Sequence, residues 1–267
     1  WKVQWGMDLF NNIYFGKTVL ITGNTGFKGS WLANILIRLG ANVIGYSLSP
    51  FTTPNHFKIL GLKYKTYFED INNIQKLSKI VEIHQPDIIF HLAAQPLVRL
   101  SYKNPINTYL TNVMGTANLL EAARKNKNVK AIVIVTTDKC YENVEQSIGY
   151  KETDKMGGYD PYSSSKGCAE LLTNSYRTSF FNVSDFGITH NTLIASARAG
   201  NVIGGGDWSN DRLIPDIVRA ATKNNEVVIR NPISTRPWQH VLEPLNGYLK
   251  LGEKLLTGQK EFADGWN

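Results

Sequence analysis

Three reactive side chains stand together at Thr137-Asp138-Lys139, at the end of an apolar, strand-like run. Downstream, Tyr162 and Lys166 are four residues apart, so on a helix they share one face. A free tyrosine has a pKa near ~10, and a neighbouring ammonium favours the phenolate, which is a usable base toward a sugar hydroxyl. Thr137 can hold that hydroxyl in line by a hydrogen bond. These residue types predict hydride removal from a sugar alcohol, with an acid at hand for loss of water.

A glycine-rich loop near the amino end offers a place for the hydride acceptor. Lys17–Thr22 is a buried-strand pattern that runs into the loop, and Ser30–Leu39 is a helix pattern that follows it. Glycines there permit a tight turn, the approach of backbone N–H groups to a pyrophosphate, and close helix packing. The spacing G-x-x-G-x-x-G departs from G-x-G-x-x-G, and its alternative is a structural turn; the place between strand and helix favours nucleotide binding. The candidate residues are Gly23, Gly26, Phe27, Lys28 and Gly29.

Three further strand ends contribute candidate cofactor residues. Ser47 stands where an acidic residue would hold a ribose hydroxyl, and no arginine marks a 2′-phosphate site, so the residues alone leave NAD and NADP open. Asp70 and Ile71 are candidates for the adenine edge, although Asp70 can equally cap the helix that follows. Leu92, Ala93 and Ala94 are small enough for a cofactor to pass close to the backbone, or simply to pack tightly.

Strand and helix patterns alternate along most of the chain. Such alternation implies a parallel sheet covered on both faces, the doubly wound Rossmann-like α/β fold, with a ligand crevice outside the carboxyl ends of the strands. Besides the first strand and helix, we expect strands at Asn42–Ser47, Asp87–His91, Val129–Val135 and Thr192–Arg198, and helices at Ile74–His84, Pro105–Lys125 and Tyr162–Phe180.

The character of the chain changes after Arg198, where a triple glycine, Asp207-Trp208 and two prolines precede a strand-like segment, Glu226–Arg230. We expect residues 1–200 to form the dinucleotide-binding domain. Residues 201–267 are expected to begin a smaller substrate lobe, interleaved with the last elements of the sheet.

The composition of the chain limits the kinds of ligand and partner that we expect it to bind. A formal charge of +7 suits an anionic ligand such as a nucleotide, and because the basic residues are spread out we expect no nucleic acid. The two cysteines are too few for a metal site or a disulfide framework, so we expect no metal and a reducing cytoplasm. No apolar run approaches the ~20 residues that span a bilayer, and Trp1–Gly6 lacks a signal-peptide core.

Taken together, these motifs resemble the extended short-chain dehydrogenase/reductases that act on sugar nucleotides. Within that family the chain is most similar to the CDP-glucose 4,6-dehydratase branch, through residues 204–208 and 236–240 in particular. The resemblance implies tightly bound NAD, regenerated in each turnover, and CDP-glucose as substrate. It also implies that relatives continue past Asn267. The matching segments are residues 22–32, 91–99, 111–116, 137–143, 160–166, 198–208 and 236–241.

The resemblance also implies a division of roles among the reactive residues. Tyr162 takes the proton of the sugar 4-hydroxyl, and Asp138 protonates the departing 6-hydroxyl. Lys139 occupies the position at which dTDP-glucose dehydratases carry a glutamate base. A lysine acts as a base only when burial or a nearby cation lowers its pKa, and a close Asp138–Lys139 ion pair would oppose that shift. Whether Lys139 or another group is the base stays open at this stage.

Five residues are candidates for the substrate. Arg99, Arg212 and Arg236 are expected at the diphosphate because the guanidinium fork matches phosphate oxygens, against the alternative of solvated surface arginines. Gln95 and Asn201 are expected to contact the sugar or base, or else to be loop amides satisfied within the chain.

The sequence also leads to an expectation for the oligomeric state and leaves two alternative functions to weigh. Related enzymes pair through helices that flank the cofactor domain, so we expect a homo-oligomer formed through Pro105–Lys125 and the helix beginning at Tyr162. A sugar-nucleotide 4-epimerase or reductase would share Thr137, Tyr162 and Lys166 but has no need of the acid. A silent nucleotide sensor on the same scaffold has no use for an activated phenol.

Overall fold

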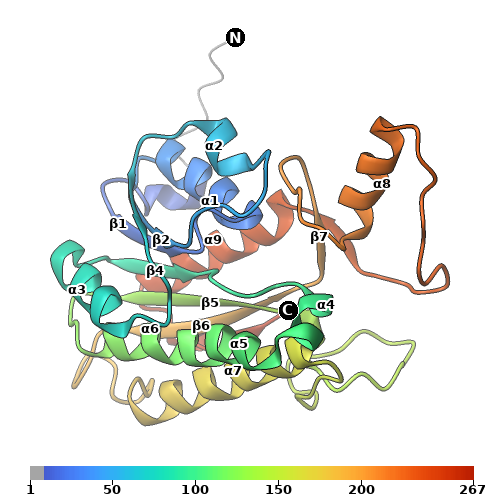
Figure 1. Ribbon diagram of the computed structural model, residues 1–267. Helices are drawn as coiled ribbons and strands as arrows, with labels where there is room; N and C mark the ends of the chain where they lie inside the picture. The colour runs from blue at the N-terminus through green and yellow to red at the C-terminus, as the bar shows by residue number, and fades with distance from the viewer. Residues whose placement is uncertain (1–8) are drawn as a thin grey trace.

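The protein is built on a seven-stranded sheet, seen in a computed structural model that describes residues 9–267 (Figure 1). Trp1–Gly6 therefore lies outside the described residues. The strand order is β3-β2-β1-β4-β5-β6-β9, and every neighbouring pair is parallel. This order confirms the doubly wound fold, with the reversal of direction between β1 and β4. The strands are β1 (Thr18–Thr22), β2 (Asn42–Ser47), β3 (Lys65–Phe68), β4 (Ile88–His91), β5 (Ala131–Thr137), β6 (Leu193–Ala199) and β9 (Gly265–Trp266).

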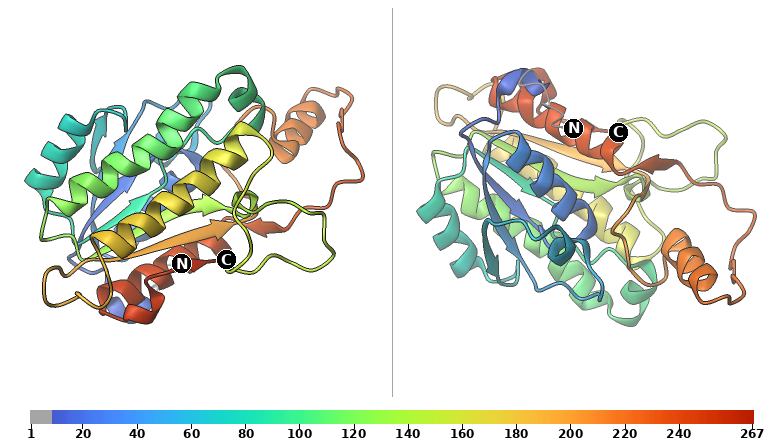
Figure 2. Two further views of the ribbon diagram at one scale, coloured as in Figure 1. Left: turned by 90° about the horizontal axis from the view of Figure 1, so that it is seen from below. Right: turned by 90° about the horizontal axis from the view of Figure 1, so that it is seen from above.

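Helices cover both faces of this sheet (Figures 1 and 2). One face carries α1 (Phe27–Arg38) and α9 (Leu242–Leu256), with α2 (His56–Leu60) against α1. The other face carries α3 (Ile74–His84), α6 (Gly115–Arg124) and α7 (Pro161–Ser179). Two short helices, α4 (Val98–Lys103) and α5 (Pro105–Tyr109), pack on α7. Because both faces are covered, the strands are apolar throughout rather than alternating.

The core consists of two layers, one on each side of the sheet. Val19, Ile21 and Phe90 point toward α1 and α9, and all three are fully buried. Leu20 and Ile89 point to the opposite side, toward α3 and α6. This alternation follows from the two-residue period of a strand, and it fixes the register that brings the carboxyl ends of the strands to one edge.

Residues after 200 build two different parts of the molecule. Strands β7 (Asn201–Ile203) and β8 (Trp238–His240) form a small parallel pair, and the segment between them carries α8 (Leu213–Thr222), which projects beyond the end of the sheet (Figure 2). The chain then returns through α9 and the 3-10 turn Lys260–Phe262 to add β9 beside β6. The final elements thus belong to the main sheet although they follow the projecting part in sequence.

Two local expectations were wrong, and a third was incomplete. The predicted helix Pro105–Lys125 is present as a continuous run from Pro105 to Arg124, but it contains a π-helical turn, Leu110–Met114. Helix α1 begins at Phe27 instead of Ser30. Glu226–Arg230 forms no strand; its β-branched run favours one locally, but Val228 lies exposed and the segment pairs with no strand of the described chain. A strand needs a partner, which the sequence pattern alone does not supply.

Candidate active site

The glycine loop lies at the point where the strand order reverses. Gly23 has φ +73°, and a Cβ there would lie 2.7 Å from the backbone of Leu92 and Ala93 at the end of β4. A Cβ at Gly29 would lie 2.1 Å from the carbonyl oxygen of Gly23. Both positions therefore need glycine because a Cβ would clash, and Gly23 needs it also because its backbone is left-handed. Helix α1 starts at an N-cap, Gly26, that has no side-chain cap, so its N–H groups suit a phosphate.

Lys28 rises from this loop into the centre of the site. Its amine donates a hydrogen bond to the hydroxyl of Tyr248 on α9 at 3.2 Å. Burial, together with the charges of Lys166 and Arg212, lowers the pKa of Lys28 to about 7, whereas Asp138 opposes the shift. The lysine is thus an amine that gains a proton readily when an anion arrives.

The remaining candidate cofactor residues lie in different surroundings. The hydroxyl of Ser47 lies 2.8 Å from that of Thr25, which donates to Leu48 O, so the end of β2 is tied to the glycine loop. Asp70 does not cap α3: its carboxylate accepts from the backbone N–H of Asn72, and the cap is Asn73. Ile71 is buried. Leu92, Ala93 and Ala94 lie directly after β4, beside the loop glycines.

Thr137, Asp138 and Lys139 form a compact cluster at the carboxyl end of β5. The Thr137 hydroxyl donates to Asp138 Oδ1 at 2.9 Å, and Lys139 Nζ lies 3.4 Å from the same oxygen. Lys139 also donates to the side-chain oxygen of Asn201 at 3.2 Å. The structure therefore forms the ion pair that sequence reasoning identified as opposing a base role for a lone lysine, and it adds Asn201 as an anchor.

Tyr162 and Lys166 face this cluster from the first turns of α7. Burial raises the pKa of Tyr162 to about 12, while Arg212 and the Thr137 hydroxyl pull it down. Lys166 Nζ donates to the carbonyl of Val135 at 3.1 Å, and burial lowers its pKa to about 8. Burial thus outweighs the groups that lower the phenol pKa, which are Arg212 and Thr137 and do not include the expected Lys166.

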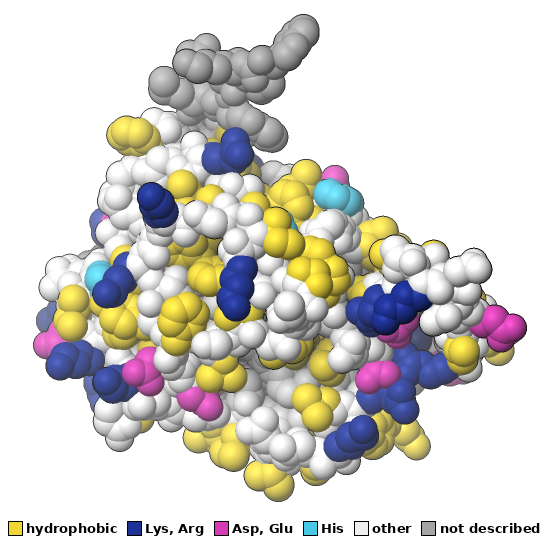
Figure 3. All heavy atoms as spheres, turned by 45° about the horizontal axis from the view of Figure 1, so that its top comes forward, with side chains coloured by type: hydrophobic (Ala, Val, Ile, Leu, Met, Phe, Trp, Pro, Cys, Tyr) yellow, Lys and Arg dark blue, Asp and Glu magenta, His cyan; other side chains and the backbone are white. Residues whose placement is uncertain are grey.

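The candidate substrate arginines are held by carboxylates. Arg99 pairs with Asp211 at 2.7 Å, and Arg212 pairs with Asp207 at 2.8 Å. Basic and acidic side chains gather together at the end of the molecule where α8 projects (Figure 3). Arg236, in contrast, is exposed, and within residues 9–267 its guanidinium donates only to the carbonyl of Thr235. Arg99 and Arg212 are preoriented near the site, whereas Arg236 is not.

Gln95 turns away from the site. Its amide nitrogen donates to Leu97 O at 3.1 Å and to the Thr108 hydroxyl at 3.0 Å, while its oxygen accepts from Leu97 N at 2.7 Å. Both amide protons are used within the loop. The structure accordingly favours the satisfied loop amide over a substrate contact for Gln95.

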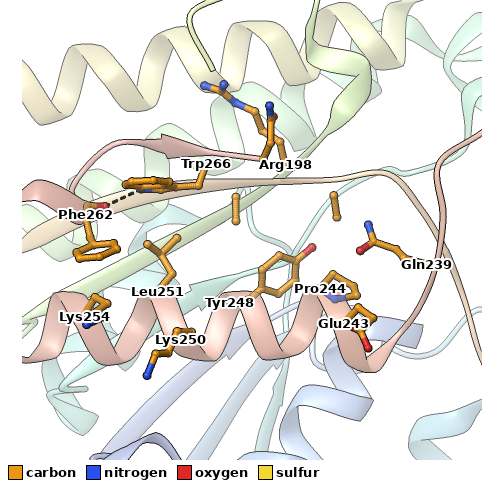
Figure 4. A pocket seen from close by; sticks show the side chains of 14 residues that line it. Arg198, Gln239, Glu243, Pro244, Tyr248, Lys250, Leu251, Lys254, Phe262 and Trp266 are labelled. Carbon is orange, nitrogen blue, oxygen red and sulfur yellow. Dashed lines mark hydrogen bonds between the residues drawn. The ribbon is translucent and has the colours of Figure 1, made fainter. Parts of the chain in front are cut away.

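A cavity of about 320 Å³ lies beside the candidate site and is lined by α9, the end of β6, Gln239 of β8, and Phe262, Trp266 and Asn267 (Figure 4). None of the candidate site residues lines it, but Tyr248, whose hydroxyl meets Lys28, does. Within residues 9–267 no group of three or more His, Cys, Asp or Glu side chains could hold a metal, and no helix there has the length and apolarity to cross a membrane.

Sequence reasoning missed several residues that the structure brings to the site. Tyr248 meets Lys28, while Asp207 and Asp211 hold the arginines. Glu170 was detectable, because it lies one helical turn beyond Lys166 on the same face of α7. The others carry no local signal, since their partners are distant in sequence.

The strand order, the glycine loop and the Thr137–Tyr162–Lys166 set define a dinucleotide-dependent protein of the short-chain dehydrogenase/reductase type. The family model for GDP-mannose 4,6 dehydratase matches residues 20–258. The chain belongs to this family, the NAD-dependent nucleotide-sugar 4,6-dehydratases.

The chain is also similar to individual proteins and solved structures. The chain is 54% identical to CDP-glucose 4,6-dehydratase of Salmonella typhimurium over 96% of its own length and 72% of that protein's. CDP-paratose 2-epimerase of Salmonella typhi is 33% identical over 61% of this chain and 53% of that one. Among solved structures, epimerase Mth375 of Methanothermobacter thermautotrophicus superposes with a TM-score of 0.82 at 26% identity, covering 98% of this chain and 74% of that one. The NAD-bound dTDP-glucose 4,6-dehydratase DesIV of Streptomyces venezuelae gives a TM-score of 0.77 at 23% identity, with 93% and 74% covered.

Proposed function

We propose that this protein is a hydro-lyase that converts CDP-D-glucose to CDP-4-dehydro-6-deoxy-D-glucose and water, with NAD as its tightly bound cofactor. The observation that carries the proposal is the Asp138 carboxylate, which accepts the Thr137 hydroxyl at 2.9 Å inside the hydride site. An epimerase or a sensor needs no acid at this place. The similarity to the Salmonella dehydratase supports CDP-glucose as the substrate.

The residues present fit the cofactor. The clash-free turn at Gly23 and Gly29, the uncapped start of α1 and the amine of Lys28 would receive the pyrophosphate. Ser47 and Asp70 would lie toward the adenosine half, and Leu92–Ala94 beneath it. Bound NAD supplies the acceptor that takes a hydride from carbon 4 and returns it to carbon 6.

The first chemical step belongs to Thr137, Tyr162 and Lys166. Thr137 orients the sugar 4-hydroxyl, and the oxygen of Tyr162 takes its proton as carbon 4 loses a hydride. Burial keeps the phenol of Tyr162 protonated in the protein without ligand, so its own phenolic proton must pass to solvent before Tyr162 can take the proton of the 4-hydroxyl. Lys166, bonded to Val135 O, supplies a fixed positive charge under the phenol.

The second step belongs to Asp138 and Lys139. The new ketone acidifies carbon 5, and elimination then requires one proton taken from carbon 5 and one delivered to the departing 6-hydroxyl. The two groups of an ion pair share one transferable proton. When such groups interact strongly, the apparent pKa values describe the pair and not either residue alone. We assign both transfers to the Asp138–Lys139 pair. With the shared proton on Asp138, this residue delivers it to the departing 6-oxygen while the neutral amine of Lys139 takes the proton of carbon 5; Lys139 gives that proton back to carbon 5 when hydride reaches carbon 6. Asn201 anchors the amine.

The arginines at the edge of the site are proposed for the diphosphate. Arg99 and Arg212 already hold their guanidinium groups against carboxylates, so they need only exchange one anion for another. Arg236 would join them by moving, since it is exposed in the protein without ligand.

We also propose that the protein is a homo-oligomer formed through one face of its helical layer. Ile106, Leu110 and Met114 expose their side chains on consecutive turns, and Leu171 is exposed on the neighbouring α7. Together with Tyr102 they form an apolar surface on helices that flank the cofactor domain, which is the composition of an interface.

One experiment tests the activity and separates the rivals. The full-length protein is incubated with CDP-glucose, and the product mass and the amount of free NADH are followed. Loss of one water without net NADH supports the dehydratase. An unchanged mass with altered stereochemistry would identify an epimerase, and no turnover would favour a sensor.

A further inference from the structure

A buried carboxylate lies one helical turn beyond Lys166. Glu170 accepts hydrogen bonds from the hydroxyls of Thr136 on β5 and Ser196 on β6, the latter at 2.6 Å. It also forms an ion pair with Arg198 at 2.9 Å, and the two side chains are only 4% and 6% exposed. Burying two charges is favourable only when their geometry and remaining hydrogen bonds are satisfied, so this group is strongly fixed in place.

Arg198 extends the connection to the other side of the site. Its guanidinium donates to the hydroxyl of Tyr141 at 2.6 Å and lies 5.3 Å from the centre of that ring. Figure 4 shows its side chain rising from β6 away from α9. Tyr141 directly follows the 3-10 turn Asp138–Cys140, so it holds the backbone that carries the elimination residues.

The two ends of this chain of contacts serve different chemical steps. Glu170 is on the same helix as Tyr162 and Lys166, the residues of the hydride step. Tyr141 is next to Asp138 and Lys139, the residues of elimination. The connection runs from α7 through β6 to the turn. Within residues 9–267 none of its three members is hydrogen-bonded to a catalytic side chain.

We propose that Glu170, Arg198 and Tyr141 are positioning residues that set the place of the Asp138–Lys139 pair relative to Tyr162 and Lys166. The inference rests on the proposed dehydratase function. Three groups hold the Glu170 carboxylate: the hydroxyls of Thr136 and Ser196 and the guanidinium of Arg198. Tyr141 joins this group through its hydroxyl, which accepts from Arg198 and also donates to Asn267 Oδ1 at 2.7 Å. Removing that hydroxyl releases the elimination turn and leaves the hydride residues in place.

The test is Tyr141→Phe, which keeps the ring and its stacking on Tyr150, whose centroid lies 5.2 Å away. Full-length enzyme with bound NAD is mixed with CDP-glucose in single-turnover reactions. The absorbance of reduced nicotinamide reports oxidation at carbon 4, and product mass reports loss of water. We expect the reduced cofactor to form at the wild-type rate and to disappear roughly 10- to 100-fold more slowly, the size of effect that small misplacements of reacting groups produce.

The matched control is Tyr150→Phe. The Tyr150 hydroxyl bonds only within its own loop, to Val144 N and Asn143, so its removal should change neither phase. A second variant, Arg198→Lys, keeps the charge beside Glu170 but lacks the fork that reaches both partners, and it should show the same split as Tyr141→Phe. This variant decides the question if Tyr141→Phe is poorly folded.

The outcomes separate two kinds of failure. A wild-type protein that does not dehydrate CDP-glucose overturns the proposed function and, with it, the two-step division. A wild-type protein that dehydrates normally, together with variants that slow both phases equally or neither, overturns the positioning chain alone.

Discussion

The amine of Lys139 lies 3.4 Å from the carboxylate of Asp138, and both side chains are about one-third exposed. This contact makes the two residues one acid–base unit in our proposal. We expect Asp138→Asn and Lys139→Gln each to spare oxidation at carbon 4 and to slow water loss by roughly 10²- to 10⁴-fold, the usual contribution of general acid–base catalysis. Single-turnover absorbance and product mass measure the two steps separately.

The double variant is the sharper measurement. Residues that act as a unit show non-additive effects, so Asp138→Asn with Lys139→Gln should be little slower than either single variant. If the two effects multiply instead, the residues act independently, and the shared proton is wrong.

Tyr162→Phe should abolish oxidation. The variant removes the oxygen that accepts the 4-hydroxyl proton, and we expect formation of reduced cofactor to fall by roughly 10²- to 10⁴-fold, with no dehydrated product. Tyr159→Phe is a matched control, because Tyr159 is 98% exposed three residues away. Rapid hydride transfer by Tyr162→Phe would assign the base to another residue.

The affinity for NAD should depend on pH through Lys28. Its pKa is about 7 in the protein without ligand, and the pyrophosphate would raise that pKa, so binding takes up a proton above pH 7. Below about pH 7 the amine is charged in both states and contributes no slope; above it, affinity should fall by at most about tenfold per pH unit. Calorimetric titration of NAD from pH 6 to 9 measures this. Lys28→Met should flatten the curve, whereas Lys79→Met, an exposed change on α3, should not.

Gly29→Ala should disrupt the cofactor loop. Its Cβ would lie 2.1 Å from the Gly23 carbonyl oxygen, so the loop must move, and we expect both a lower melting temperature and loss of NAD binding. Gly247→Ala is the control: it is also helical, but a Cβ there has open space, and alanine should stabilise that helix by about 0.5–1 kcal/mol. Thermal melts with and without NAD distinguish the two. Normal NAD binding by Gly29→Ala would show that this loop is not part of the cofactor site.

Ile106→Glu should break the proposed oligomer. Ile106 is 70% exposed at the centre of the apolar surface, and burying a glutamate there leaves an unpaired charge. Sedimentation velocity should show a shift to monomer. Ile188→Glu places the same charge at another exposed site, 80% accessible, and should leave the assembly unchanged. Unchanged sedimentation of both variants would place the interface elsewhere.

The sequence by itself determined the doubly wound sheet, the glycine loop and the Tyr162–Lys166 pair. Each rests on a short-range regularity: apolar strands alternating with helices, a turn that only glycine permits, and two residues one helical turn apart. The same local reasoning failed at Glu226–Arg230, where a strand-like run has no strand beside it.

Only the tertiary structure decided which partners the functional side chains have. Lys28 meets Tyr248 across 220 residues, and Lys139 meets Asn201 across 62. Gln95 turned inward, and Asn73 rather than Asp70 capped its helix. The parallel sheet brings strand ends to one edge whatever their separation in sequence, whereas the orientation of a side chain there depends on packing and on which hydrogen-bond partners are nearest. The orientation of these side chains therefore depends on the whole fold, and no local pattern in the sequence predicts it.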